Sequence, residues 1–297
     1  MTAAGERIEI RSRERDRVCS AAMSYPTIGD GHKTGGRVVL PGTTRFGCPE
    51  GYDPAIWQAR VDLAACYHLC NAFDFNEGIC NHLTVMVPGT TDRFLCIPYG
   101  LMWDEVTASN LLLLDESGTI LEGEGSIDAT AFFIHKHIHA AGAVCVLHTH
   151  QPYASAICCL RGDDFRLQMT HQNCLRFYDE IAYDPVFNGL VLDENEGARL
   201  ASLMNGKRVL LHQNHGVIIC GNSVAEAFDD VYYLERACQV QILAQSTGKP
   251  LAIVDDATAL KFNQDCAADN GMANWANLHW AALKRRLMRG PGSIFCT

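Results

Sequence analysis

Two spacings of apolar residues alternate along the chain and predict a mixture of helices and strands. Apolar residues three or four positions apart form one face of an amphipathic helix, whereas short alternating or continuous apolar runs between turn residues indicate strands. The first spacing predicts helices that begin at Pro54 and Pro152 and helices over 127–141, 194–204, 224–248 and 272–289. The second predicts strands over 80–87, 94–97, 111–114, 144–147, 209–212 and 215–220.

The periodic pattern weakens at both ends of the chain. Residues 1–50 are rich in Gly, Arg, Ser and Pro, so we expect a flexible N-terminal arm there. Residues 253–297 read as a C-terminal segment in which 255–270 is linker-like and a last helix has Trp275 on its apolar side. The sequence has no internal repeat and no sign of a second core. We therefore predict one domain over 51–252, flanked by two tails.

Composition and charge exclude several classes of protein. Hydrophobic residues make up 48% of the 297 residues and charged residues 20%, which is typical of a globular protein. No apolar run reaches the roughly 18 residues that a membrane span needs, and a formal charge of −10 argues against nucleic acid as a partner. The 14 cysteines are scattered and form no CxxC pair. No secretory signal is expected in the first eighteen residues, so reduced thiols and a cytoplasmic location are expected.

One strand of the predicted set ends in two histidines. The apolar run 144–147 leads directly into His148, Thr149 and His150, and Pro152 then begins a helix. Side chains two apart on an extended segment point to the same side, so His148 and His150 can converge. Such a pair is typical of a divalent metal site, although a pair that only forms hydrogen bonds remains the alternative.

A third imidazole is available 65 residues farther along the chain. His215 precedes Gly216 at the start of a predicted strand, where glycine lets the backbone approach a site closely. Three neutral imidazoles leave coordination positions open, which is the arrangement expected of a catalytic metal. His212 is the rival third ligand, but it ends a strand and could equally cap it.

These motifs occur in an order that resembles the class II aldolase/adducin family. HTHQPYASA (148–156) is followed by NHG (214–216) and YYLERA (232–237), and the upstream segments 77–84, 97–100 and 107–110 agree as well. The resemblance covers roughly residues 55–250. It implies an α/β fold with three α/β/α layers around a mostly antiparallel central sheet, assembled as a homotetramer.

The resemblance also carries a cofactor and substrate contacts onto this chain. The family's metal ligands correspond to His148, His150 and His215, and the ion is expected to be zinc or another divalent ion such as Mn²⁺ or Fe²⁺. Asn81 lies where aldolases present Gly-Asn to the substrate. Tyr99 and Gly100 stand in the loop that replaces the family's Thr-Gly or Ser-Gly phosphate loop, and we take all three as candidate substrate-binding residues.

Two departures from the sugar-phosphate aldolases affect the expected reaction. Their acid/base glutamate aligns with Ala131 here, and their Ser-Ser phosphate contacts align with Ala129 and Thr130. A phosphorylated substrate is therefore not expected. Asp128, one helical turn before Ala131, is a substitute acid/base, although a first-turn Asp is commonly a helix cap.

His171 is the second acid/base candidate, in a polar loop that in the family can reach a neighbouring subunit's site. We thus expect a metal-dependent lyase that cleaves a C–C bond beside a carbonyl or hydroxyl of a small molecule. The metal would stabilise the enediolate or enolate that remains after cleavage. The alternatives are a decarboxylase of a hydroxylated aromatic acid, an iron-dependent oxygenase, and a non-catalytic interaction domain like the adducin head.

Overall fold

The structure of the protein is a computed structural model that describes residues 23–24, 37–38 and 47–297. The strands are β1 (Met23–Ser24), β2 (Arg37–Val38), β3 (His82–Met86), β4 (Arg93–Cys96), β5 (Leu112–Asp115), β6 (Ile120–Glu122), β7 (Cys145–Thr149), β8 (Ile181–Asp184), β9 (Val209–His212) and β10 (Val217–Gly221). The helices are α1 (Pro54–Ala72), α2 (Ala129–Ala140), α3 (Pro152–Cys158), α4 (Gln172–Leu175), α5 (Glu194–Met204), α6 (Val224–Gln245), α7 (Asp256–Ala267) and α8 (Gly271–Leu287). Short 3₁₀ turns lie at Trp103–Glu105, Gly162–Asp164, Ala268–Asn270 and Pro291–Cys296.

Eight of these strands form one sheet in the order β6-β5-β4-β3-β7-β10-β9-β8. All neighbours in the sheet run antiparallel except β8 and β9, which are parallel. The position of β7 in the middle matters for the site, because β7 pairs with β3 on one side and with β10 on the other. Both pairings place residues of distant segments next to His148.

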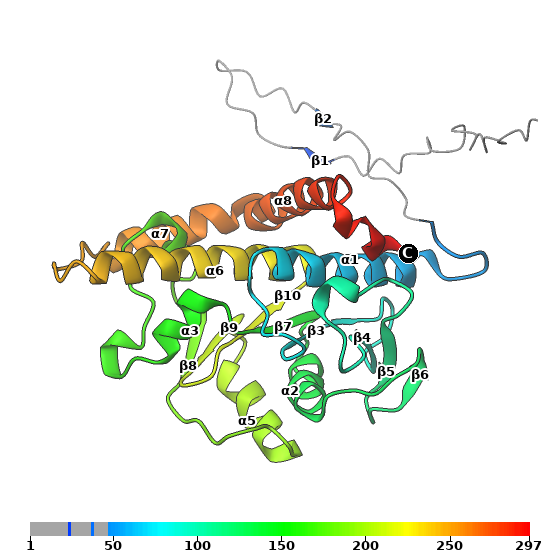
Figure 1. Cartoon of the computed structure of the whole chain (residues 1–297). Coiled ribbons are helices and arrows are strands. Elements are labelled where there is room, and N and C mark those ends of the chain that lie inside the picture. The colour runs from blue at the N-terminus through cyan, green and yellow to red at the C-terminus, as the bar shows by residue number, and fades with distance from the viewer. Residues whose placement is uncertain (1–22, 25–36, 39–46) are drawn as a thin grey trace, which may run out of the picture.

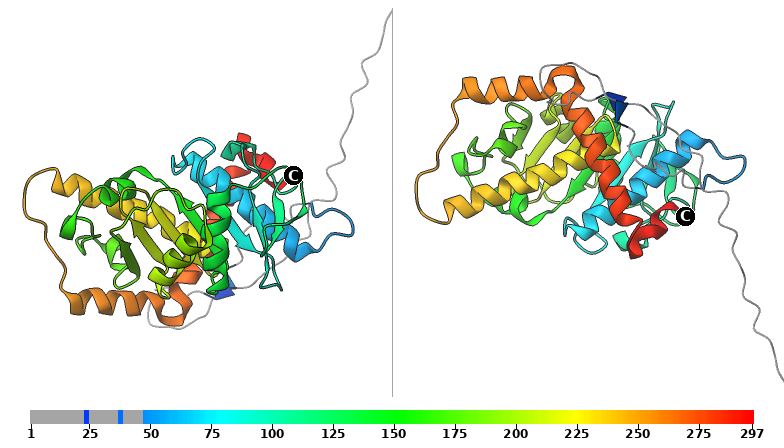
Figure 2. Two further views of the ribbon diagram at one scale, coloured as in Figure 1. Left: turned by 90° about the horizontal axis from the view of Figure 1, so that it is seen from below. Right: turned by 90° about the horizontal axis from the view of Figure 1, so that it is seen from above.

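Helices cover both faces of the sheet, which confirms the predicted three-layer α/β/α fold (Figure 1). Helices α1 and α6 lie on one face, and α8 crosses over them as an additional outer layer (Figure 2). Helices α2 and α5 lie on the opposite face, where Ile134, Ile138 and Leu200 pack against Val146 and Ile218 of the sheet. Alternation along β7 then directs every second side chain, from Val146 to His148, towards the face covered by α2 and α5.

Helix α1 shows how local sequence fixes an element. The Asp53 side chain accepts hydrogen bonds from Ala55 N and Ile56 N, and Pro54 occupies the first helical position. The apolar stripe of this helix is buried as its four-residue spacing predicts; its members are Trp57, Val61, Ala65 and Leu69. No described helix is long and apolar enough to cross a membrane.

Three predictions about local structure were wrong or incomplete. Residues 255–270 are not a linker, because Asp256–Ala267 forms α7 behind the N-cap Asp255. This helix buries only Ala259 and Cys266, so it has no apolar stripe that a sequence pattern could reveal. Strands β6 and β8 also escaped notice, since both are short edge strands of three and four residues.

The last helix buries a different face from the predicted one. Trp275 is 49% exposed, whereas the core contacts of α8 come from Ala276, Trp280, Leu283 and Leu287. Both sets follow helical spacing, so periodicity alone could not choose between them. Most of the predicted flexible arm, residues 1–50, lies outside the described residues.

Candidate metal centre

Strand β7 and the turn after it supply two histidines of the site. Residues 145–147 of this strand are completely buried, and His148 is 3% exposed at its end. The following turn is closed by a buried carboxylate from another helix: Glu235 of α6 accepts hydrogen bonds from Tyr153 N and Ala154 N at 2.8 and 2.9 Å. Since these two amides belong to the first turn of α3, Glu235 caps that helix and fixes the turn that contains His150.

The connection between β9 and β10 supplies the third histidine. His215 lies in a tight turn in which Asn214 adopts a left-handed conformation with φ of 58° and His212 N donates to Gly216 O at 3.0 Å. Strand β10 then runs beside β7, with Val217 opposite Thr149. This pairing brings His215 to the end of β7.

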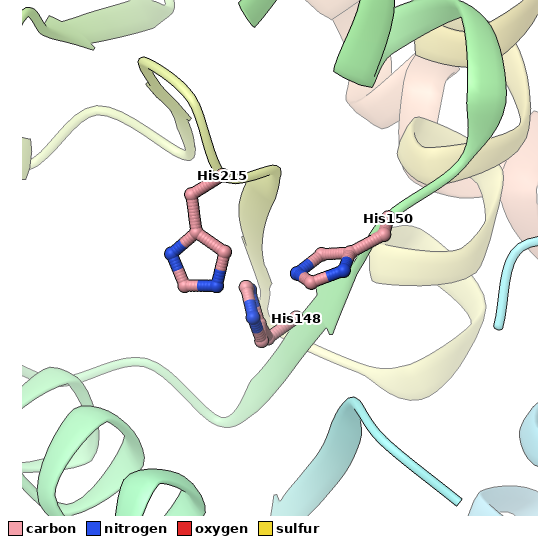
Figure 3. A group of neighbouring side chains, drawn as sticks. All are labelled: His148, His150 and His215. Atoms are coloured by element: carbon pink, nitrogen blue, oxygen red, sulfur yellow. The ribbon is translucent and has the colours of Figure 1, made fainter. Parts of the chain in front are cut away.

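His148, His150 and His215 converge, as Figure 3 shows, and we call this group the His triad. The ring centroids lie 4.8–5.0 Å apart, and one ligand atom from each residue lies within 4.8 Å of the others. The structure therefore brings together all three predicted metal ligands, at separations that suit a single ion.

The hydrogen bonds of the triad leave one nitrogen of each ring free for a metal. Nδ1 of His148 donates to Val217 O at 3.0 Å, and Nδ1 of His150 lies 3.2 Å from Oε2 of Glu77. Nδ1 of His215 lies 3.2 Å from Nδ1 of His212. Nε2 of His150 is buried without a hydrogen-bond partner in the described part of the chain. Partners at Nδ1 that leave Nε2 bare are the usual support of metal-bound histidines, so these residues fit a metal.

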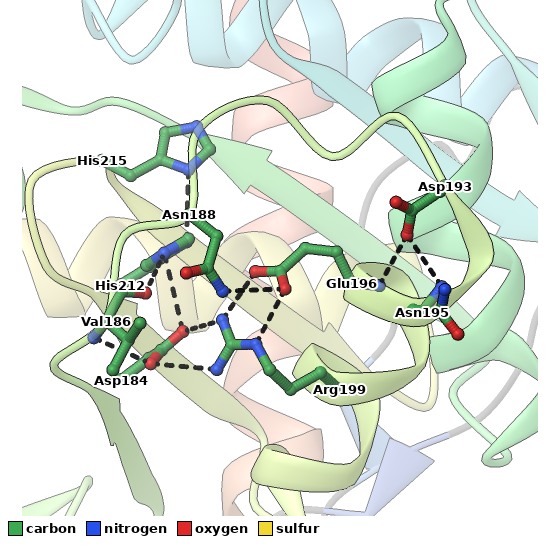
Figure 4. A network of polar contacts seen from close by, with 9 residues as sticks. All are labelled: Asp184, Val186, Asn188, Asp193, Asn195, Glu196, Arg199, His212 and His215. Carbon is green, nitrogen blue, oxygen red and sulfur yellow. Dashed lines mark hydrogen bonds and ion pairs between the residues drawn. The ribbon is translucent and has the colours of Figure 1, made fainter.

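His212, the alternative third ligand, forms a hydrogen bond with His215 of the triad. Its Nε2 donates to Val186 O at 3.0 Å and lies 3.5 Å from a carboxylate oxygen of Asp184. A neutral His212 must then accept a hydrogen bond at Nδ1. Nδ1 of His215, which lies 3.2 Å away, therefore carries the proton and donates to Nδ1 of His212. Figure 4 shows this network, in which Arg199 binds Asp184 at 2.6 Å and holds it against β9.

Burial and the neighbouring imidazoles keep His148 and His215 uncharged. Burial is the main cause that lowers the pKa of His215 to about 3, and nearby rings such as that of His150 lower it further. Burial also lowers the pKa of His148 well below its usual range. Metal ligation requires neutral imidazole, and these two residues provide it well into the acidic range.

Gly216 is required by the space around His150. A Cβ atom at this position would lie 2.5 Å from Cδ2 of His150 and 2.7 Å from Thr149 O. Any side chain would therefore displace a ligand, which accounts for glycine after His215.

The predicted substrate-binding residues differ in their burial: Asn81 is buried, whereas Tyr99 is exposed. Asn81 is 6% exposed, adopts a left-handed backbone with φ of 70°, and has an Oδ1 that is buried without a described partner. Tyr99 is 52% exposed, and Gly100 follows it with φ of 102° in the turn after β4. The free acceptor of Asn81 is the sort of group a substrate would satisfy, while Tyr99 and Gly100 remain predictions.

Both acid/base candidates are helix caps in this chain. Asp128 caps α2 by accepting from Thr130 N and Thr130 Oγ1, each at 2.8 Å. Burial lowers the pKa of His82, and the nearby carboxylate of Asp128 opposes part of this lowering. His171 is exposed and caps the short α4 by accepting from Asn173 N at 3.3 Å. Neither has a hydrogen bond or ring contact to the triad in the described residues, so their catalytic roles remain predictions. Ala131, at the usual glutamate position, is 1% exposed in the core.

Two supporting carboxylates were not identified from the sequence. In the sequence, Glu77 and Glu235 occur only as members of the family motifs 77–84 and 232–237, with no role of their own. Their roles depend on contacts 73 and 81–82 residues away along the chain, which spacing cannot reveal.

Comparison with known proteins places the chain in a family. Residues 61–242 match the family described as the class II aldolase and adducin N-terminal domain. The chain belongs to this family, which confirms the resemblance drawn from its motifs. Members of the class II aldolases use a divalent metal.

Individual relatives are similar in sequence or structure to this chain over most of its length. A Pseudomonas aeruginosa protein whose name places it among the class 2 aldolases is 36% identical over 247 residues, covering 80% of this chain and 92% of its own length. The decarboxylase NovR of Streptomyces niveus is 29% identical over 254 residues, covering 83% and 93%. The crystal structure of an aldolase II superfamily protein from Pseudomonas syringae superposes with a TM-score of 0.75 at 33% identity, covering 83% of this chain and 98% of that one.

Replacing Gly216 should loosen the metal site without unfolding the protein. In Gly216→Ala the new methyl group pushes His150 aside, and we expect the affinity for Zn²⁺ to fall by about 10- to 100-fold, as for other changes that disturb ligand orientation. Competition with a chromophoric chelator measures this affinity, and circular dichroism reports the fold. His137→Asn is the control, since His137 bonds to Glu194 outside the triad. Unchanged zinc affinity in Gly216→Ala would contradict the geometry.

Acid should destabilise the metal-free protein through the triad. A lowered pKa means that the unfolded chain binds protons below pH ~6.5 while folded His215 stays neutral down to about 3. Stability is then lost as the pH falls through this window, by at most about 1.4 kcal/mol per pH unit for each such histidine. Urea unfolding of the metal-free protein between pH 7 and 5 measures the slope. His215→Asn should show a shallower slope, and parallel pH profiles for the two proteins would refute the assignment.

Proposed function

We propose that this protein is a divalent-metal-dependent lyase that cleaves a C–C bond beside a carbonyl or hydroxyl of a small, non-phosphorylated substrate. The observation that carries the proposal is the His triad, in which every Nδ1 has a partner and Nε2 of His150 is buried without one. A purely structural trio of histidines would have no reason to leave this buried atom unsatisfied.

The triad would hold Zn²⁺ or a similar divalent ion with imidazole nitrogens alone. When bound, such an ion supplies Lewis-acid stabilisation of the negative charge left on the substrate after bond cleavage. Three protein ligands leave positions for the oxygen atoms of a substrate. Glu77 and His212 contribute by fixing the orientation of the rings of His150 and His215.

The remaining roles belong to residues around the triad. Asn81 binds a polar substrate group through its free Oδ1, and Tyr99 with Gly100 forms the outer loop of the substrate site. Asp128 is the acid/base within the chain. His171 is exposed, so its acid/base role requires that it reach the site of a neighbouring subunit in a homotetramer. A cytoplasmic location is part of the same proposal.

The proposal of an unphosphorylated substrate rests on what replaces the phosphate contacts. Ala129 offers no side-chain donor, and the hydroxyl of Thr130 is already donated to Asp128 at 2.8 Å. Neither residue is therefore available to bind a phosphate group as the family's serines do.

Decarboxylation is the second candidate reaction. It needs the same electron sink as aldol cleavage but releases CO₂ in place of a carbonyl compound. The relative named as a decarboxylase supports it, because its similarity extends over 83% of this chain. Oxidative chemistry with iron in the triad, and a non-catalytic role like that of an adducin domain, are the outcomes that the test must distinguish.

Proton exchange tests the shared step of these reactions. Zn²⁺-loaded protein is incubated in D₂O with unphosphorylated hydroxy ketones and hydroxy acids, including hydroxylated aromatic acids. NMR then follows deuterium uptake next to the carbonyl and the release of an aldehyde or CO₂. We expect exchange or cleavage of at least one class, lost on chelation and reduced by at least about 10³-fold in the His148→Ala, His150→Ala double variant, because the electron sink is gone.

His137→Asn again serves as the control and should retain full activity. Iron content with oxygen consumption would favour the oxygenase alternative. A protein that binds no stoichiometric divalent ion and catalyses no exchange would contradict the lyase and favour the non-catalytic domain.

A further inference from the structure

A chain of hydrogen bonds between buried side chains connects α2 to the strand beside the triad. Nδ1 of His139 lies 2.8 Å from Ala143 O, and its Nε2 lies 2.7 Å from Oγ1 of Thr84. The same Oγ1 lies 2.5 Å from Nδ1 of His135, whose Nε2 lies 2.7 Å from Nδ1 of His82. All four side chains are at most 6% exposed. We call His139, Thr84, His135 and His82 the buried histidine chain.

The donor and the acceptor of every hydrogen bond in this chain follow from the backbone carbonyl of Ala143 at one end. All three rings are buried and none has a described carboxylate as a hydrogen-bond partner; because burial disfavours a charged imidazole, each ring is neutral and carries one N–H. Ala143 O can only accept, so His139 donates from Nδ1 and accepts at Nε2.

The single hydroxyl proton of Thr84 therefore goes to His139. Oγ1 of Thr84 must then accept from Nδ1 of His135, which leaves Nε2 of His135 as an acceptor. His82 consequently donates from Nδ1, and its Nε2 carries a lone pair. No described residue forms a hydrogen bond with this atom.

This lone pair belongs to a ring that lies beside the triad. His82 on β3 is directly opposite His148 on β7, and the two ring centroids are 5.0 Å apart. Asn81, the preceding residue, contributes a second acceptor without a described partner, its Oδ1. Free acceptors on two consecutive residues are suited to a ligand that offers hydrogen-bond donors.

We propose that Nε2 of His82 binds the substrate by accepting a hydrogen bond from a hydroxyl group next to the metal centre. The buried histidine chain fixes this polarity, so the site selects an alcohol over an ether or a ketone at that position. The inference rests on the proposed function only in requiring that the triad hold an ion to which the substrate binds.

The tautomers of the chain can be measured without any ligand. Long-range ¹H–¹⁵N NMR spectra of the Zn²⁺-loaded, ¹⁵N-histidine-labelled protein distinguish protonated from bare ring nitrogens. We expect the proton on Nδ1 in His82, His135 and His139. A proton on Nε2 of His82 would overturn the proposal, whether or not a ligand binds.

A pair of probes that differ in one donor tests the binding role. Glycolate and methoxyacetate offer the same two chelating oxygens, but methoxyacetate has no hydroxyl proton. The Zn²⁺-loaded wild type should bind glycolate about tenfold more tightly in calorimetry, which is the effect of one hydrogen bond of roughly 1.4 kcal/mol. Equal binding of the two probes, or binding of neither, contradicts the assignment.

Thr84 provides a matched pair of variants. Thr84→Ser keeps the hydroxyl, so it should retain the preference and the tautomer of His82. Thr84→Val has nearly the same shape but interrupts the chain, so His82 should populate both tautomers and the preference should fall towards unity. His82→Phe should abolish the preference, and all three variants should bind one Zn²⁺ as the wild type does.

The two proposals can fail separately. An unchanged preference in Thr84→Val and His82→Phe overturns the role of His82 while leaving a lyase at the triad intact. A preserved preference in a protein that shows no proton exchange with any substrate class overturns the lyase and keeps the acceptor assignment.

Discussion

The pairing of β7 with its two neighbours is the constraint on which the site depends. Pairing with β10 places Ile218 opposite His148 and lets Val217 O fix the ring of His148, while the turn before β10 delivers His215. Pairing with β3 places His82 on the other side of the same residue. A shift of one residue in either pairing would turn these side chains to the opposite face of the sheet.

Burial of so many imidazoles is tolerable because each forms a hydrogen bond and the deeply buried rings are held neutral. The triad, His212 and the buried histidine chain together place seven imidazoles on the α2 and α5 side of the sheet, with lowered pKa values wherever burial is deep. Charged rings would cost far more to bury than neutral ones. The site therefore offers neutral donors to an ion and neutral acceptors to a ligand, and its polarity is set by backbone carbonyls such as Ala143 O and Val186 O.

Much of this could be predicted from the sequence, because the decisive signals were local. The strand that ends in His148 and His150, the glycine after His215 and the stripe of α1 are all short-range patterns. The family motifs extended them to the fold. The support by Glu235 and the buried histidine chain could not be predicted, since they depend on which helix covers which face. Helix α7 and the buried side of α8 were misjudged for a related reason: their burial is decided by packing and not by a unique periodicity.

The central claim is that His148, His150 and His215 hold one divalent ion. X-ray absorption at the zinc edge, on protein loaded with one equivalent of Zn²⁺, measures this directly. The predicted result is one ion per chain with three imidazole nitrogens at about 2.0–2.1 Å and light-atom ligands completing the shell, and loss of that signal in the His148→Ala, His150→Ala double variant. A sulfur ligand at about 2.3 Å, or a spectrum unchanged by the double substitution, would contradict the account.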